Sequence, residues 1–184
     1  MKFNEYMNRV LNEGVSISIG QLNTLEDPVY VLIAGGVGAG KSYVLSKNTK
    51  LPIIDIDDVT MELGGGEYSA KNTSKAMAIT KKKVLDMLDS GESFIHMGTS
   101  ANLNATINKL KVAKDKGFTT VLLFIDTPPE QAIENNKERV TKGGRGDTIP
   151  DHKFQRTYDG AKNTFDNLKN DDLVDYVIHY NNRR

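Results

Sequence analysis

Cysteine is absent from this chain of 184 residues, which excludes disulfide bonds and metal sites built from thiolates and is typical of a cytosolic protein. Long apolar runs are absent as well. No uncharged stretch approaches the roughly 20 residues that cross a bilayer, and no basic segment followed by an apolar one precedes them. We therefore expect a cytoplasmic protein with no membrane segment.

Net charge is the third absence, because 24 lysine and arginine residues balance 24 aspartate and glutamate residues. No overall field draws such a chain toward nucleic acid, so a nucleic-acid substrate would need a local basic groove. Internal repeats and low-complexity tracts are also lacking. The length suits one domain with a core of ordinary size, and we expect it to act as a monomer.

Apolar runs alternate with helical patterns from Val29 onward. This order predicts an α/β fold with a parallel sheet and helices on both faces. Strands are expected at residues 29–34, 51–57, 93–98, 119–126 and 175–180.

Helix signals stand between these strands. A helical pattern from about Thr73 to Ser90 stops at Gly91, and Asn102 is expected to cap the next helix. In "TPPE", Thr127 is the expected cap and Pro128 the first helical residue. A longer amphipathic helix is predicted by apolar residues that step by three and four: Phe154, Tyr158, Ala161, Phe165 and Leu168.

The first 28 residues are less regular. Phe3, Met7, Val10 and Leu11 have helical spacing, and "VSISIG" alternates like a short strand. We interpret residues 1–28 as an N-terminal appendage to a domain formed by residues 29–184.

The strongest motif is "GGVGAGKS" at residues 35–42, which fits G-x-x-x-x-G-K-[ST]. Glycines let backbone N–H groups approach a phosphate chain closely, and the helix that follows adds its positive N-terminus. Lys41 then reaches the β- and γ-phosphates, and the Ser42 hydroxyl is placed to bind Mg²⁺. The nucleotide-binding residues are predicted to be Gly35, Gly36, Val37, Gly38, Ala39, Gly40, Lys41, Ser42 and Tyr43.

A kinase also needs a base for its acceptor, and "IIDIDDV" supplies carboxylates at the carboxyl end of the second strand. Strand alternation would place Asp55 and Asp57 on one face, with Asp58 beginning the loop. Helix capping or solvation is the alternative role, favoured for Asp58. We predict that Asp57 is the base.

Positive charge for the transferred phosphoryl group is expected from Arg139, Arg145 and Arg156. They flank the glycine-rich stretch "TKGGRGDTIP", and a loop between two helices is typical of a lid. Any one of the three could instead be an ordinary surface residue. We predict a lid around residues 139–156 with at least one working arginine.

Taken in order, "GGVGAGKS", "IDIDDV", "GTSAN", "FIDTPPEQAIENNKERV" and "GGRGDTIP…FQRTYDGAKN" resemble the small P-loop kinases, and more narrowly the zeta-toxin and polynucleotide-kinase group. The resemblance covers residues 29–182. It implies a three-layer P-loop fold with strand order 2-3-1-4-5, Asp57 as the base that deprotonates the acceptor hydroxyl, and Thr99 beside the acceptor. Asp55 is grouped with them as an acceptor-binding residue.

Three positions depart from the group. Met97 stands where zeta toxins carry a glutamate, and Thr60 where polynucleotide kinases carry an arginine. The third strand also lacks the aspartate of polynucleotide kinases. For the metal, Asp126 ends a strand suited to a Walker B residue, but Asp55 could equally assist magnesium through water.

The sequence thus predicts an ATP- and Mg²⁺-dependent kinase that phosphorylates a hydroxyl on a small molecule, such as a sugar nucleotide or a nucleoside. Two alternatives stay open at this point. One is a kinase acting on polynucleotides or on a modified base in DNA; the other is a nucleotide-binding regulatory or toxin-like module with little turnover.

Overall fold

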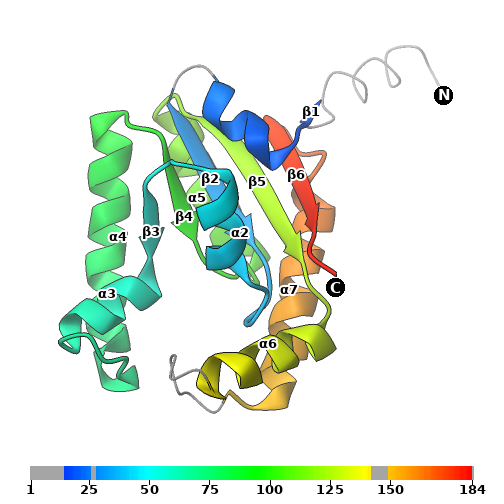
Figure 1. The fold of residues 1–184 in the computed structure, drawn as a ribbon. Helices are drawn as coiled ribbons and strands as arrows, with labels where there is room; N and C mark the ends of the chain where they lie inside the picture. The colour runs from blue at the N-terminus through cyan, green and yellow to red at the C-terminus, as the bar shows by residue number, and fades with distance from the viewer. Residues whose placement is uncertain (1–14, 26–27, 142–148, 184) are drawn as a thin grey trace.

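In the computed structural model, which describes residues 15–25, 28–141 and 149–183, six parallel strands form one sheet (Figure 1). The strands are β1 (Val15–Ser16), β2 (Val29–Ala34), β3 (Ile53–Asp55), β4 (Phe94–Met97), β5 (Thr119–Asp126) and β6 (Tyr176–Asn181). The helices are η1 (Ile19–Thr24), α2 (Lys41–Asn48), α3 (Ile56–Leu63), η2 (Ala70–Asn72), α4 (Thr73–Ser90), α5 (Leu103–Asp115), α6 (Pro129–Thr141) and α7 (Asp151–Leu168).

The sheet runs in the order β1-β6-β5-β2-β4-β3. If β2 is counted as the first strand and the sheet is read from β3, the strands β2 to β6 follow the expected order 2-3-1-4-5. The sheet differs from the expectation by a sixth strand, β1, because Val15 and Ser16 pair in parallel with Tyr176 and Val177.

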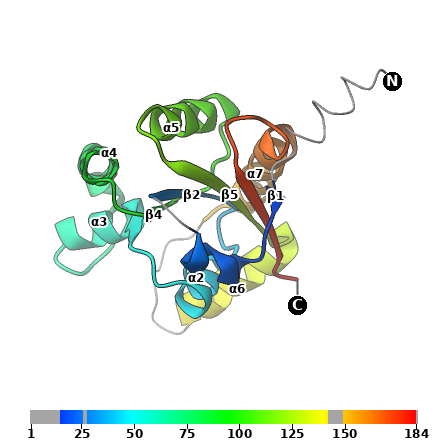
Figure 2. The same cartoon turned by 90° about the horizontal axis from the view of Figure 1, so that it is seen from above.

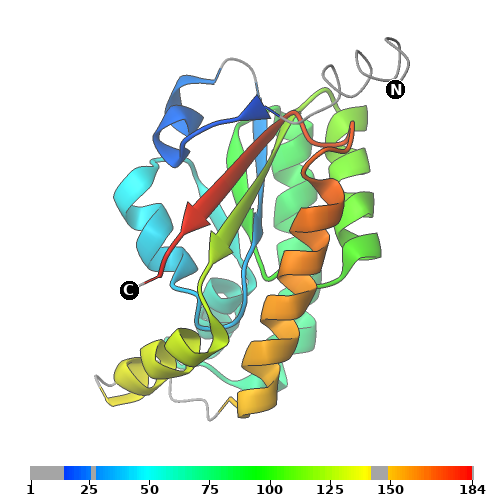
Figure 3. The ribbon, with the colours of Figure 1, turned by 90° about the vertical axis from the view of Figure 1, so that its right-hand side faces the viewer.

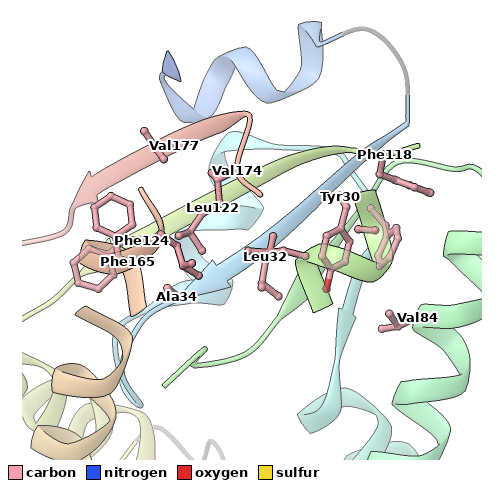
Figure 4. Close-up of a cluster of buried hydrophobic side chains, with 14 of the residues drawn as sticks. Tyr30, Leu32, Ala34, Val84, Phe118, Leu122, Phe124, Phe165, Val174 and Val177 are labelled. Carbon is pink, nitrogen blue, oxygen red and sulfur yellow. The ribbon is translucent and has the colours of Figure 1, made fainter. Parts of the chain in front are cut away.

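Helices cover both faces of the sheet and complete three layers (Figure 2). On one face, α4, α5 and α7 pack against alternate residues of the strands, such as Tyr30, Leu122 and Phe124 (Figure 4). The intervening residues, such as Val31 and Leu123, pack on the other face against α2 and η1. The α/β prediction is therefore confirmed, and both faces of the central strands are buried.

The long helices begin and end where their sequences predicted. α4 ends before Gly91, which adopts a left-handed conformation at φ 71°, and Asn102 accepts a hydrogen bond from the Ala105 N–H at the start of α5. The stripe on α7 buries Phe154, Ala161, Phe165 and Leu168, of which the last three join the core cluster on the sheet, with Phe165 stacked on Phe124. Full burial of one Phe or Leu side chain contributes about 1.5–3 kcal/mol to folding.

Residues near the N-terminus contribute to the body of the protein. Ile19 and Leu22 of η1 are buried in the second core cluster, and β1 extends the sheet. The helix expected around Phe3–Leu11 lies outside the described residues. The division between an appendage and a domain at residue 28 stays a prediction.

Within the part of the chain that the structure describes, no helix has both the length and the apolar character of a membrane span.

Candidate active site

The glycine loop connects β2 to α2 in the geometry that the motif predicts. β2 ends at Ala34 in the centre of the sheet, and α2 begins at Lys41. Gly38 and Gly40 adopt left-handed conformations with φ of 75° and 76°, which residues with a side chain rarely adopt. The N-terminus of α2 therefore faces the same edge of the sheet as the loop, where a phosphate chain would bind.

Side chains from distant segments hold this loop from outside. The Thr127 hydroxyl and the Asn182 amide both donate to the Ala39 carbonyl, at 2.9 and 3.0 Å. Asn135 of α6 donates to the Gly38 carbonyl at 3.1 Å. The expected cap on α6 was therefore wrong: the helix begins at Pro129, and the Thr127 hydroxyl stabilises the phosphate loop instead.

Lys41 and Thr99 both make hydrogen bonds to Gly35, the first glycine of the loop. The ammonium group of Lys41 donates to the Gly35 and Gly36 carbonyls at 3.2 and 2.8 Å, and the Gly35 N–H donates to the Thr99 carbonyl at 3.1 Å. This last bond fixes the segment after β4 against the phosphate loop. The loop and the predicted acceptor residue Thr99 are thereby adjacent.

A pocket of about 600 Å³ opens at this edge of the sheet. Six of the nine predicted nucleotide-binding residues line it, and Gly35, Gly36 and Ala39 lie behind it as hydrogen-bonding backbone. The other predicted residues in its wall are Asp55, Asp57, Thr99 and Arg139. The structure thus brings the phosphate loop together with the predicted base, one arginine and the acceptor threonine.

The acidic segment differs from the prediction in its secondary structure. A strand through residue 57 was wrong, because β3 ends at Asp55 and α3 begins at Ile56. Asp55 caps α3, with its Oδ1 accepting from the Asp57 N–H at 3.0 Å, and Asp57 and Asp58 occupy the first turn. Carboxylates are favoured at these positions because they face the positive end of the helix dipole. Asp57 reaches the pocket from this first turn, whereas Asp58 is exposed and does not line it.

The pKa of Asp55 is raised to about 6, mainly by burial and to a smaller extent by the charges of Asp57 and Asp58, although the Asp57 N–H and Lys41 act to lower it. A bound cation would stabilise the charged form of a carboxylate that lies among like charges beside an anionic ligand. Asp55 is therefore the carboxyl in the pocket wall best placed to respond to a bound metal.

The three predicted arginines have different positions. Arg139 lines the pocket, donates to the Asn136 side chain at 2.6 Å and has a buried Nε with no hydrogen-bond partner among the described residues. Arg156 is exposed and does not line the pocket, and Arg145 lies outside the described residues. Lys153 of α7 lines the pocket and was missed. Its only signal was a spacing of three residues from Arg156, which places both on one side of a helix.

Asp126 is held by other side chains, away from the pocket lining. Its carboxylate accepts from the Tyr158 hydroxyl and from Arg183, both at 3.0 Å, and His179 Nε2 lies 3.2 Å away. Burial alone would raise the pKa of Asp126, but these hydrogen bonds outweigh it and hold the pKa below its usual range. Of the two candidates for assisting the metal, the pocket contains Asp55 and not Asp126.

The donor set suits Mg²⁺ bound together with phosphates. Mg²⁺ is typically held by one or two carboxylates plus substrate phosphates, and the pocket offers the Ser42 hydroxyl and the Asp55 and Asp57 carboxylates. Among the described residues, no group of three or more acidic or histidine side chains could hold a metal alone. The residues present therefore fit a metal that binds with the nucleotide.

A comparison with protein families finds that the family model described as "Zeta toxin" matches residues 18–184 of this chain. The match begins at residue 18, so it includes η1, which the resemblance based on motifs left out. None of the curated proteins compared with this chain matches it significantly in sequence.

Several solved structures share the fold. The chain is similar to one in the Pnkp1/Rnl/Hen1 RNA repair complex, with a TM-score of 0.64 and 17% identity over 81% of this chain and 49% of that one. Against the PezAT toxin–antitoxin system of Streptococcus pneumoniae, the TM-score is 0.62 with 18% identity over 100% of this chain and 79% of that one. Against AvrRxo1-ORF1:AvrRxo1-ORF2 with ATP, the TM-score is 0.64 with 14% identity over 90% of this chain and 57% of that one.

This chain therefore spans about half the length of the matching chain of the RNA repair complex (49%). At these sequence identities the similarity establishes a common fold. Substrates and partners must be argued from the residues of this chain.

Proposed function

This chain belongs to the zeta toxin family, and from that premise we propose that it is an ATP- and Mg²⁺-dependent kinase that transfers the γ-phosphoryl group to a hydroxyl acceptor. The observation that carries the proposal is the pocket in which the phosphate loop, Asp57, Thr99 and Arg139 meet. Phosphoryl transfer requires positioning, a base and positive charge rather than covalent chemistry by the protein, and these residues supply all three.

In the proposed reaction, Asp57 accepts the proton of the acceptor hydroxyl. The acceptor oxygen forms a bond to the γ-phosphorus as the bond from that phosphorus to the β–γ bridging oxygen breaks, and ADP leaves. Lys41 and Arg139 stabilise the charge on the transferred group, and Thr99 orients the acceptor. Arg145 and Arg156 stay candidate lid residues, and Lys153 is added as a cation in the pocket wall.

Ser42 would hold the magnesium ion, with Asp55 beside it. When bound, the ion supplies neutralising charge for the phosphates. We further propose that the protein acts as a cytoplasmic monomer.

The identity of the acceptor separates the main proposal from its alternatives. A small hydroxyl compound is favoured because Lys41, Arg139 and Lys153 in the pocket wall stand beside two carboxylates and form no extended basic groove of the kind that a polynucleotide would need. Because a structurally similar chain occurs in an RNA repair complex, the test also includes polynucleotide acceptors. The similarity to a chain of a toxin–antitoxin system is the reason to test the other alternative as well, a nucleotide-binding regulatory or toxin-like module with little turnover.

The test is transfer of label from γ-labelled ATP with magnesium to a panel of acceptors. The panel holds 5′-hydroxyl oligonucleotides, hydroxymethylated DNA, nucleosides, UDP-amino sugars and simple alcohols. Lys41→Ala should abolish labelling, whereas Lys47→Ala, on the same helix but outside the pocket, should leave it unchanged. Tight ATP binding with no labelling of any acceptor would contradict the kinase proposal and favour the regulatory module.

A further inference from the structure

A second pocket, of about 680 Å³, is lined mainly by residues of α4 and α5. These two helices lie on the same face of the sheet (Figure 2). The volume of the pocket is typical of sites for small organic ligands. Met77, Leu85 and Val112 line it and are 59%, 38% and 40% exposed, so three of the larger exposed apolar side chains of the described residues gather at one site. Apolar side chains left exposed around a single hollow are characteristic of a binding site.

The floor of this pocket is uncharged. The Tyr30 hydroxyl lies 2.8 Å from His96 Nδ1, and both side chains line the pocket. Burial lowers the pKa of His96 to about 3, with a smaller contribution from the charge of Lys109, so the imidazole is neutral at pH 7. Among the described residues, Lys81 and Lys109 are the charged side chains in the lining.

One buried polar group in the lining has no partner. Thr80 on α4 is 6% exposed, and its hydroxyl makes no hydrogen bond to the described residues. Leaving a buried hydroxyl unpaired costs about 1–3 kcal/mol. A ligand with one polar atom deep in the pocket would remove this cost.

The two pockets adjoin one another. Ile56, Met97 and Gly98 line both of them. Ile56 stands between Asp55 and Asp57, which line only the phosphate-side pocket, and Gly98 precedes Thr99. A molecule lying in the apolar pocket would therefore have its outer end beside the predicted base.

We propose that this pocket receives the body of the phosphoryl acceptor, and that the acceptor is a hydrophobic alcohol whose body is an aromatic or alicyclic ring system. The inference rests on the proposed kinase function and names the substrate class of that site. A sugar nucleotide would place a charged diphosphate and several hydroxyls against a lining whose surface is mainly apolar, although Lys81 and Lys109 reach it, and this would carry a large desolvation cost. A polynucleotide would need a groove that follows its backbone with positive charge.

The experiment uses naphthylethanol as the probe, because its ring is apolar and fluorescent and it carries a primary hydroxyl. We expect saturable binding of this probe to the protein. Val112→Trp, which fills the pocket from a half-exposed position on α5, should raise the Kd roughly tenfold or more. Lys111→Trp is the matched control, since its neighbouring position on α5 is exposed and outside the lining.

Both variants should bind a fluorescent ATP analogue as the parent does, which shows that they fold and keep the phosphate site. With labelled ATP and magnesium, the probe should receive phosphate from the parent and from Lys111→Trp. Its KM should rise in Val112→Trp in parallel with the Kd.

The possible failures are distinguishable. Labelling of a sugar nucleotide or an oligonucleotide that Val112→Trp does not affect would overturn the inference and leave the kinase proposal standing. Probe binding that Val112→Trp does not weaken would also overturn it. Binding that Val112→Trp weakens, with no acceptor of any class labelled, would contradict the kinase proposal and with it the acceptor role of the pocket.

Discussion

Asp55 at the end of β3 and Asp57 in the first turn of α3 are close in sequence but have different surroundings. Asp55 is partly buried, caps α3 and has a raised pKa, whereas Asp57 lies in the first turn and lines the pocket beside the phosphate loop. A general base must be deprotonated before it can accept a proton. The local geometry therefore favours Asp57 for the chemistry and gives Asp55 a structural role that a bound cation would reinforce.

The raised pKa of Asp55 makes stability depend on pH in a predictable direction. Because the folded pKa of about 6 exceeds the ordinary value of 3.8 for an aspartate, the folded protein binds this proton more tightly than the unfolded chain does. The resulting stability is fully present below about pH 4 and is lost as the pH rises through about 6. Asn still caps a helix, so Asp55→Asn should raise the free energy of unfolding relative to the parent by an amount that grows from about pH 4 to pH 7.

Urea unfolding without nucleotide at several pH values measures this difference. Asp86→Asn, at an exposed position on α4, is the control for removing a carboxylate elsewhere in the protein. A difference for Asp55→Asn that is constant across the range would contradict the assigned pKa.

At the scale of elements, α6 and α7 support the phosphate loop from outside the sheet (Figure 3). Asn135 of α6 donates to the Gly38 carbonyl, and Thr157 of α7 accepts from the Val37 N–H at 3.0 Å. A Cβ at Gly38 would lie 2.5 Å from the Ala132 carbonyl oxygen. The backbone of α6 thus leaves no room for a side chain at this turn of the loop.

Gly38→Ala tests this contact against a matched position. Gly65 has a similar left-handed conformation, at φ 68°, but nothing lies within 4 Å of its Cβ position. Both substitutions incur about 1–2 kcal/mol of backbone strain. Gly38→Ala should cost more than Gly65→Ala in urea unfolding and should also weaken ATP binding, whereas Gly65→Ala should bind ATP normally. Equal losses in the two variants would show that α6 does not constrain the loop.

Helices and strands whose apolar pattern continues over many residues were predictable from the sequence. α4, α5 and α7 follow such patterns or capping residues, and the strands follow β-branched runs. α3 was missed because Ile56 continues the apolar run of β3, although Asp55 followed by two acids in the first turn is a helix start signal. β1 lies within "VSISIG", whose alternation indicated a short strand, but no local pattern encodes its parallel pairing with β6.

At the scale of the whole molecule, the candidate site exists only when distant segments meet. The phosphate loop is a local motif, so the sequence was enough to predict it. Lys153, Thr127 and Asn182 reach the loop or the pocket through the packing of α7 and the ends of β5 and β6, and this packing is not encoded in any local pattern of the sequence. The apolar pocket lined mainly by α4 and α5 depends likewise on how two helices sit on the sheet.

Because the site draws on most of the fold, ATP should stabilise the protein as a unit. At about 100 times its Kd, a ligand that binds only the folded state adds about 2.7 kcal/mol. For a chain of this size that corresponds to a rise in Tm of roughly 5–10 °C. Thermal unfolding with and without MgATP measures the rise. Lys41→Ala should remove most of it, and an unchanged rise in that variant would place ATP elsewhere.

The most direct test of the central claim compares two adjacent carboxylates. Phosphoryl transfer from γ-labelled ATP across the acceptor panel would be measured for the parent, for Asp57→Asn and for Asp58→Asn. Asp57 lines the pocket and Asp58 is exposed beside it, so the two variants change the same charge in the same turn of α3. The account predicts that Asp57→Asn lowers kcat about 10²–10⁴-fold with ATP binding retained, and that Asp58→Asn stays near the parent rate. Transfer by Asp57→Asn at the parent rate would contradict the assignment of Asp57 as the base.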